Sequence, residues 1–247
     1  MNIRIGAFIF TPNTLMLPLA LAFFVVLAFQ GLYPGAVSAR LRAYGIVLAA
    51  IAGGVAGGAL YGWAASPAEV DELHAWLDLR FGSFGGYWGA LAAAMAGAWV
   101  ARQHVLECAD ALVPGILAGG AVARVGCLFT GCCRGITLPP GLFHGLQPFR
   151  PWPAYDLAAL LAVLAVVRIA PRRVPSLRFP GAALCLFLVA YGALRFPLEF
   201  LRDLPAVAGA LTSGQVLALA QLLAGIAGVA WLVRRDRSGH RTSYPQP

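Results

Sequence analysis

Two stretches of this chain place arginines among glycines and large apolar side chains. The first runs from Arg124 to Gly135 and reads RVGCLFTGCCRG, and the second runs from Tyr191 to Asp203 and reads YGALRFPLEFLRD. A guanidinium group in hydrocarbon costs about 2.5–3.5 kcal/mol or more at a membrane centre, so it persists where it has a partner or a task. These arginines are therefore the first candidates for a functional site.

In the second stretch, four polar residues recur at a spacing that places them on one face of a helix: Tyr191, Arg195, Glu199 and Arg202. Within a membrane this face cannot look into lipid, so it must look into a helix bundle or a wet cavity. Arg195 and Glu199 could simply neutralise each other. The alternative is that Arg202 remains for an anionic headgroup, with Tyr191 as a hydrogen-bond donor deeper in the same site.

The first stretch has the composition of an anion-binding loop. Gly126 and Gly131 allow the backbone to approach a ligand closely, and successive N–H groups can line a concavity for an anion. Arg124 and Arg134 add the forked donors that suit a phosphate group. We therefore expect this stretch to bind phosphate at the outer end of a membrane span.

Three of the five cysteines also lie in the first stretch, at Cys127, Cys132 and Cys133, and the odd total excludes a fully paired disulfide framework. They could be small unreactive residues, a redox pair or reactive thiol, or metal ligands together with His144. Their spacing matches no familiar zinc pattern. The sequence therefore predicts no metal, and no residue pattern in it points to a cofactor.

The elements that must position these residues are membrane spans. The chain is 60% hydrophobic and 11% charged, with a mean hydropathy of +0.77, whereas a soluble domain has roughly 25% charged residues. The net charge of +8 does not indicate nucleic-acid binding, because the arginines fall at the ends of apolar runs rather than in a basic stripe on a soluble module. The composition predicts an all-α polytopic membrane bundle.

Seven apolar runs approach the roughly 20 residues that a span needs. They are residues 14–33, 44–65, 85–102, 106–123, 154–170, 180–198 and 212–233. The fourth begins with acidic residues and contains Pro114, so we expect it to be short or broken. Paired glycines at 53–54 and 57–58 predict close packing of the second span. Residues 1–237 are expected to form a single transmembrane domain, followed by a polar tail over 238–247.

Arginine placement predicts how the spans are oriented. Most of the 18 arginines follow the first, third, fifth and seventh spans, and by the positive-inside rule that side is cytoplasmic. The N-terminus and the 66–84, 124–153 and 199–211 segments then face outward, while the C-terminus is cytoplasmic. Both arginine-bearing stretches lie on the outward side, where the rule predicts few arginines. An anionic ligand on that side would account for them.

Over most of its length the chain resembles the prolipoprotein diacylglyceryl transferase family. Residues 124–131 are similar to that family's arginine-isoleucine-glycine-asparagine loop, and residues 151–156 resemble its proline-serine-glutamine-leucine-tyrosine-glutamate segment. Residues 191–202 match its late signature, and residues 212–219 resemble the glycine-glutamine start of its last span. Seven spans with an outward N-terminus also agree with this family.

The resemblance implies an enzyme of the bacterial inner membrane with its active site toward the periplasm. Such an enzyme transfers a diacylglyceryl group from phosphatidylglycerol to the cysteine thiol of a prolipoprotein, or to a related thiol acceptor, and releases glycerol phosphate. The resemblance assigns catalytic roles to Arg124, Tyr191 and Arg195. It assigns substrate binding to Gly126, Gly131, Arg134, Tyr155, Glu199 and Arg202.

Two departures from that family keep other functions open. Phe84 stands where the resemblance places a histidine that could take the thiol proton, and cysteines stand where its loop has asparagine and glutamate. One alternative is a related enzyme with another acceptor, which uses Cys127, Cys132 or Cys133 in thiol or redox chemistry. Another is a phospholipid-binding membrane protein without catalysis.

Overall fold

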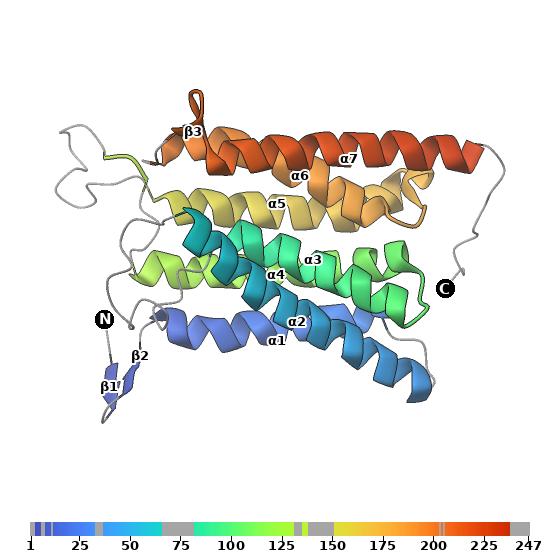
Figure 1. Ribbon diagram of the computed structural model, residues 1–247, viewed down its shortest axis with the longest axis horizontal. Coiled ribbons are helices and arrows are strands. Elements are labelled where there is room, and N and C mark those ends of the chain that lie inside the picture. Colours follow the sequence, from blue (N-terminus) through green and yellow to red (C-terminus); the bar gives the residue numbers. More distant parts are fainter. Residues whose placement is uncertain are drawn as a thin grey trace. The chain divides into compact units, whose positions relative to one another are not determined.

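The computed structural model describes residues 3–5, 8–10, 12–32, 37–65, 82–130, 135–137, 151–202, 204 and 206–237. Within these residues the chain forms seven α-helices, two 3-10 turns and two short antiparallel hairpins (Figure 1). The helices are α1 (Pro12–Leu32), α2 (Val37–Ala65), α3 (Ser83–Val100), α4 (Val105–Thr130), α5 (Trp152–Arg173), α6 (Ala182–Leu198) and α7 (Ser213–Arg237). The turns are η3 (Pro175–Leu177) and η4 (Glu199–Leu201), and the hairpins pair β1 (Ile3–Ile5) with β2 (Phe8–Phe10) and β3 (Ala206–Ala208) with β4 (Leu211–Thr212).

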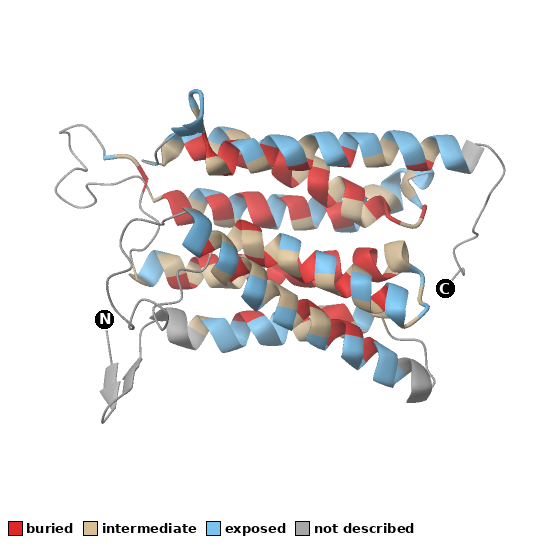
Figure 2. Ribbon diagram, viewed as in Figure 1, coloured by how far each residue is buried: buried red, intermediate tan, exposed pale blue. Residues whose placement is uncertain are grey.

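The predicted all-α multi-pass membrane fold is confirmed. In the described part of the chain, five stretches are long and apolar enough to cross a membrane, and α1 contributes a shorter apolar stretch. They are Arg40–Ala64, Val105–Thr130, Trp152–Arg173, Ala182–Leu201 and Ser213–Arg235, with Met16–Leu32 as the shorter one. Large apolar side chains such as Leu219, Leu223 and Ile226 are exposed along α7 (Figure 2). Such a surface is stable against lipid tails and costly in water.

The expectation that the fourth span is short or broken is wrong. Helix α4 continues from Val105 to Thr130 through Pro114, and more than half of the residues in its most apolar part are buried. Proline is tolerated inside a membrane helix because neighbouring groups satisfy the backbone that it frees. The same helix also takes in residues 124–130, so the first half of the expected anion-binding loop is helical.

The helices divide into two compact units, and one of them comprises Val25–Ile116. In this unit α2 and α3 pack through facing glycines. A Cβ added at Gly57 would lie 2.4 Å from the carbonyl oxygen of Gly85, and one at Gly89 would lie 2.1 Å from that of Gly53. The predicted close packing of the second span is therefore confirmed, and its partner is the Gly85–Gly89 pair.

The other unit comprises Met1–Phe24 and Leu117–Pro247, and in it α5, α6 and α7 lie side by side (Figure 1). Because successive helices alternate in direction, the start of α5, the end of α6 and the start of α7 lie at one end of this unit. Helix α6 approaches α7 closely at Gly192, where an added Cβ would lie 2.8 Å from the carbonyl oxygen of Ala218.

A reciprocal pair of hydrogen bonds fixes the start of α7. The amide N–H of Gln215 donates to the hydroxyl oxygen of Thr212 at 3.2 Å, and the N–H of Thr212 donates to the side-chain oxygen of Gln215 at 2.9 Å. This is a capping box, in which both partners satisfy amides that the first helical turn leaves without a bond. It fixes the residue at which α7 begins.

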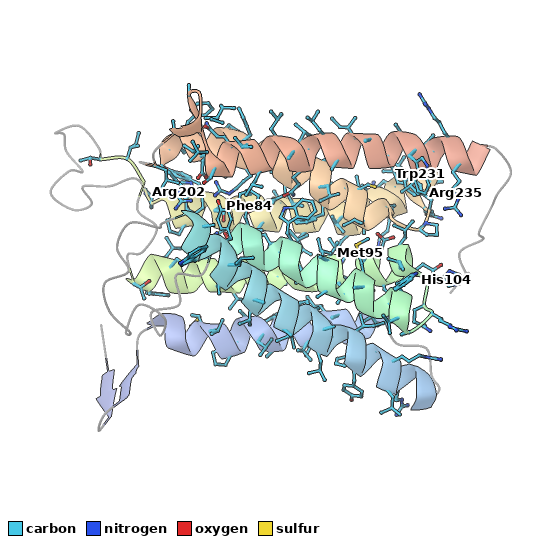
Figure 3. The ribbon with its side chains drawn as sticks, in the orientation of Figure 1. Phe84, Met95, His104, Arg202, Trp231 and Arg235 are labelled. Carbon is cyan, nitrogen blue, oxygen red and sulfur yellow. The ribbon has the colours of Figure 1, made fainter. Side chains whose placement is uncertain are left out.

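The two ends of this unit differ in charge. Arg202 lies at the end where α6 finishes, whereas Trp231 and Arg235 lie at the opposite end (Figure 3). There the Arg235 guanidinium carbon is 5.4 Å from the centre of the Trp231 ring. The arginines that end α5, Arg172 and Arg173, belong to the Arg235 end. The Arg202 end is therefore opposite the arginine-rich end.

Candidate functional site

A fully buried carboxylate, Asp156 in the second turn of α5, joins the two arginine-bearing stretches. The Nε of Arg124 in α4 donates a hydrogen bond to its Oδ2 at 2.6 Å, and the hydroxyl of Tyr191 in α6 donates to its Oδ1 at 3.1 Å. The Nε of Arg195 lies 3.9 Å from the same Oδ1. Side chains from two helices, α4 and α6, therefore converge on a carboxylate of a third helix, and Arg124 and Arg195 meet at Asp156.

Glu199 is the second buried carboxylate of the site and begins η4. Both Arg195 and Arg202 donate to it through Nη1, and the Arg202 contact is 3.2 Å. A Cβ added at Gly214, in the first turn of α7, would lie 2.4 Å from Oε1 of Glu199. The carboxylate therefore lies against the beginning of α7, where the helix dipole favours negative charge.

Among the described residues, the cluster holds more guanidinium groups than carboxylates. Arg124, Arg195 and Arg202 contact two described carboxylates, Asp156 and Glu199. Buried charges are costly unless they are paired, and the third guanidinium is the one nearest to solvent, because the side chain of Arg202 is 22% exposed. An arrangement of this kind suits an anion that enters from the Arg202 side.

An indole ring lies under all three guanidinium groups. Trp152 is the first residue of α5 and is 1% exposed. The guanidinium carbons of Arg124, Arg195 and Arg202 lie 5.1, 4.5 and 4.6 Å from the centre of its ring. These distances are within the range of cation–π attraction.

Main-chain contacts hold the two stretches together a second time. Gly135 forms an isolated antiparallel bridge with Arg202, and the N–H of Ile136 donates to the carbonyl oxygen of Leu201 at 2.8 Å. The end of the first stretch is thereby fixed beside the most exposed guanidinium of the cluster.

The structure brings five of the sequence candidates into this cluster: Arg124, Tyr191, Arg195, Glu199 and Arg202. All except Arg202 are buried. The face expected from the spacing of residues 191, 195, 199 and 202 therefore looks into the protein, as predicted. The alternative that Arg195 and Glu199 pair with each other is also observed, but this pair is one part of a larger network.

Other candidates lie elsewhere. Gly126 is buried inside α4, so it does not shape a loop. Tyr155 is 39% exposed although Asp156 beside it is fully buried, so the structure does not bring its side chain into the buried cluster. Five candidates lie outside the described residues: Gly131, Cys132, Cys133, Arg134 and His144.

Two positions bear on the alternatives. The sulfur of Cys127, which is half-buried, lies 3.9 Å from Nη1 of Arg124. Phe84, in the other compact unit, is 3% exposed, with its ring centre 6.4 Å from that of Tyr61. Among the described residues, no three histidine, cysteine, aspartate or glutamate side chains lie close enough together to hold a metal ion.

Two members of the cluster, Asp156 and Trp152, are not among the candidates that the sequence indicates. Asp156 is the acceptor at the centre of the network. It is the only acidic residue in the 154–170 run, and a lone carboxylate in an apolar span signals a buried cation. Trp152 carried no such signal, because an aromatic residue at the start of a span is ordinary.

Comparisons with known proteins agree with this description. A family model described as prolipoprotein diacylglyceryl transferase matches residues 3–231. The chain is similar to a phosphatidylglycerol–prolipoprotein diacylglyceryl transferase of Cupriavidus necator, at 35% identity over 162 residues, which is 62% of this chain and 59% of that protein. A protein of the same description from Burkholderia multivorans is 30% identical over 196 residues, covering 62% and 64% of the two chains. The match thus spans about three-fifths of the length of these relatives.

Proposed function

Because this chain belongs to the prolipoprotein diacylglyceryl transferase family, we propose that it moves a diacylglyceryl group from phosphatidylglycerol to a cysteine thiol. The acceptor would be a prolipoprotein or a related thiol substrate. In this reaction the sulfur bonds to the glycerol carbon while the bond from that carbon to the phosphate oxygen breaks. The electron pair of the broken bond leaves with glycerol phosphate, and the thiol loses its proton.

One observation supports this proposal: guanidinium groups from two distant stretches meet in a buried cluster in which three arginines contact two described carboxylates. Arg124 and Arg195 share the carboxylate of Asp156. Guanidinium groups match phosphate oxygens in geometry and form charge-assisted hydrogen bonds with them. Negative charge grows on the phosphate as it leaves, and donors that are already oriented stabilise that charge without reorganisation.

The other residues of the cluster then have supporting roles. Asp156 and Glu199 hold the guanidinium groups in place, and Tyr191 orients Asp156 through the hydrogen bond at 3.1 Å. Arg202, the most exposed of the three arginines, meets the headgroup first.

The position of the cluster within its unit indicates which side of the membrane it faces. The cluster lies at the end of its unit opposite the arginine-rich end (Figure 3), and arginine-rich ends of membrane proteins face the cytoplasm. We therefore propose an active site on the periplasmic side of the bacterial inner membrane, within a single transmembrane domain over residues 1–237.

A second candidate function is phospholipid binding without transfer. The observation that favours it is Phe84, because an apolar buried side chain stands where the resemblance places a histidine able to take the thiol proton. This protein would retain the anion site and lack the chemistry.

The test is a transfer assay with purified protein, phosphatidylglycerol vesicles and a peptide that carries a lipobox cysteine. Mass spectrometry should detect a diacylglyceryl thioether on that cysteine. Arg195→Ala should lower the rate by about 10²–10³, as expected when one preorganised donor is removed, whereas Arg235→Ala at the far end should not. The double variant Cys132→Ser/Cys133→Ser should remain active.

The outcomes separate the candidates. Phosphatidylglycerol binding without any thioether product would favour the non-catalytic function. Loss of product in the double cysteine variant, with binding intact, would favour the enzyme that uses its own thiols.

A further inference from the structure

The indole ring of Trp152 lies close to all three guanidinium groups of the cluster. The guanidinium carbons of Arg124, Arg195 and Arg202 lie between 4.5 and 5.1 Å from its ring centre. These arginines come from α4, α6 and the residue that follows η4, whereas Trp152 comes from α5. One ring is therefore shared by every guanidinium group of the site.

Three guanidinium groups around one ring repel one another. A ring has two faces, so at least two of these groups share a face. Among the described residues, Asp156 and Glu199 offset part of this repulsion. The electron-rich face of an indole attracts cations, and it does so more strongly when the ring is shielded from water, as it is here. The ring therefore offsets repulsion that the carboxylates leave.

A hydrogen bond sets the position of the ring. The indole Nε1–H donates to the carbonyl oxygen of Leu198 at 3.0 Å. Leu198 is the last residue of α6, where carbonyl groups have no partner within the helix. The bond thus joins the start of α5 to the end of α6, between Arg195 and Arg202.

We propose that Trp152 is a positioning residue that assembles the three guanidinium groups into one anion-binding cluster. Its indole face holds Arg195 and Arg202 beside Arg124, so that a single phosphate group can meet all three. Without an aromatic face the guanidinium groups would separate and bind an anion weakly. This inference rests on the proposed function, since it concerns the phosphate site of the same reaction.

Two substitutions separate the aromatic face from the hydrogen bond. Trp152→Phe and Trp152→Leu both remove the Nε1–H donor, and both keep an apolar side chain, but only phenylalanine keeps a π face. Phe179→Leu is the matched control, because Phe179 is a buried aromatic residue of the same unit, in the turn before α6. The measurements are the affinity of each full-length protein for phosphatidylglycerol in nanodiscs, competed by glycerol phosphate, and the midpoint of thermal unfolding.

Trp152→Phe should bind within about threefold of the unsubstituted protein, and Trp152→Leu should bind about tenfold or more weakly. The two variants should unfold at similar midpoints, and Phe179→Leu should change the midpoint but not the affinity. Equal affinity of the phenylalanine and leucine variants would overturn the inference while leaving the proposed function standing. If the unsubstituted protein itself shows no affinity that glycerol phosphate competes, the proposed function fails, and the role of Trp152 fails with it.

Discussion

Removal of the Asp156 carboxylate should weaken both the fold and the anion site. Asp156→Ala leaves Nε of Arg124 and the hydroxyl of Tyr191 without the acceptor that they use at 2.6 and 3.1 Å. It also leaves Arg195 without the carboxylate 3.9 Å away. The variant therefore removes the acceptor of two buried donors and one of the two described carboxylates that offset the positive charge of the cluster.

The size of the effect follows from these contacts. Breaking a buried ion pair by removing one partner costs about 3–5 kcal/mol. Two hydrogen bonds to charged groups, at about 1.5–3 kcal/mol each, give about 3–6 kcal/mol, so we use the narrower range. For a chain of this length, 1 kcal/mol moves the unfolding midpoint by about 2–4 °C. The midpoint of Asp156→Ala in detergent should therefore fall by about 6–20 °C.

A second variant separates stability from function. In Arg124→Leu/Asp156→Leu the buried pair is replaced by apolar side chains, which is often neutral or stabilising. Its unfolding midpoint should recover part of the loss, because Tyr191 and Arg195 still lack the carboxylate. Its affinity for phosphatidylglycerol should stay low because a guanidinium group is missing. Glu107→Ala, a half-buried acid at the start of α4, is the control and should cost less than about 1 kcal/mol.

The assays are thermal unfolding followed by fluorescence and lipid binding in nanodiscs. If Asp156→Ala unfolds at the same temperature as the unsubstituted protein, the carboxylate does not hold the network together. If the double leucine variant binds phosphatidylglycerol normally, Arg124 does not contribute to the anion site.

Two further predictions concern glycines. Gly57→Ala should destabilise the α2–α3 packing by about 1–3 kcal/mol, because its Cβ would lie 2.4 Å from a carbonyl oxygen. Gly45→Ala is the control, because its Cβ would have nothing within 4 Å. Unfolding midpoints test both variants, and equal losses would contradict the packing described. Gly214→Ala should displace the Glu199 carboxylate, from which its Cβ would lie 2.4 Å, and so lower the transfer rate more than the unfolding midpoint; an unchanged rate would show that Glu199 need not be fixed.

The spans were predictable because lipid imposes a length and a composition on them. Six of the seven runs coincide with helices apart from shifts at their ends, and five of the described helices are long and apolar enough to cross a membrane. Helix α4 was underestimated because the cost of Pro114 depends on the groups that surround it, and hydropathy along the chain does not contain that information. The paired glycines of α2 predicted close packing, but the partner glycines of α3 became evident only in three dimensions.

The candidate site was predictable in part, for the same reason. The spacing from Tyr191 to Arg202 placed four polar residues on one face, because helical periodicity is local. The helix tightens into η4 at Glu199, soon after Pro197, yet Arg202 still reaches that carboxylate. Which carboxylate would join Arg124 to Arg195 depended on how α4, α5 and α6 pack, and the chain alone does not specify that.

In the proposed function, Arg124 and Arg195 bind the phosphate of one phospholipid together. A crystal structure grown from a lipid phase enriched in phosphatidylglycerol tests it most directly. We expect one headgroup phosphate whose oxygens lie about 2.7–2.9 Å from guanidinium nitrogens of both residues. A headgroup bound elsewhere, with both arginines still paired only to Asp156 and Glu199, would contradict it.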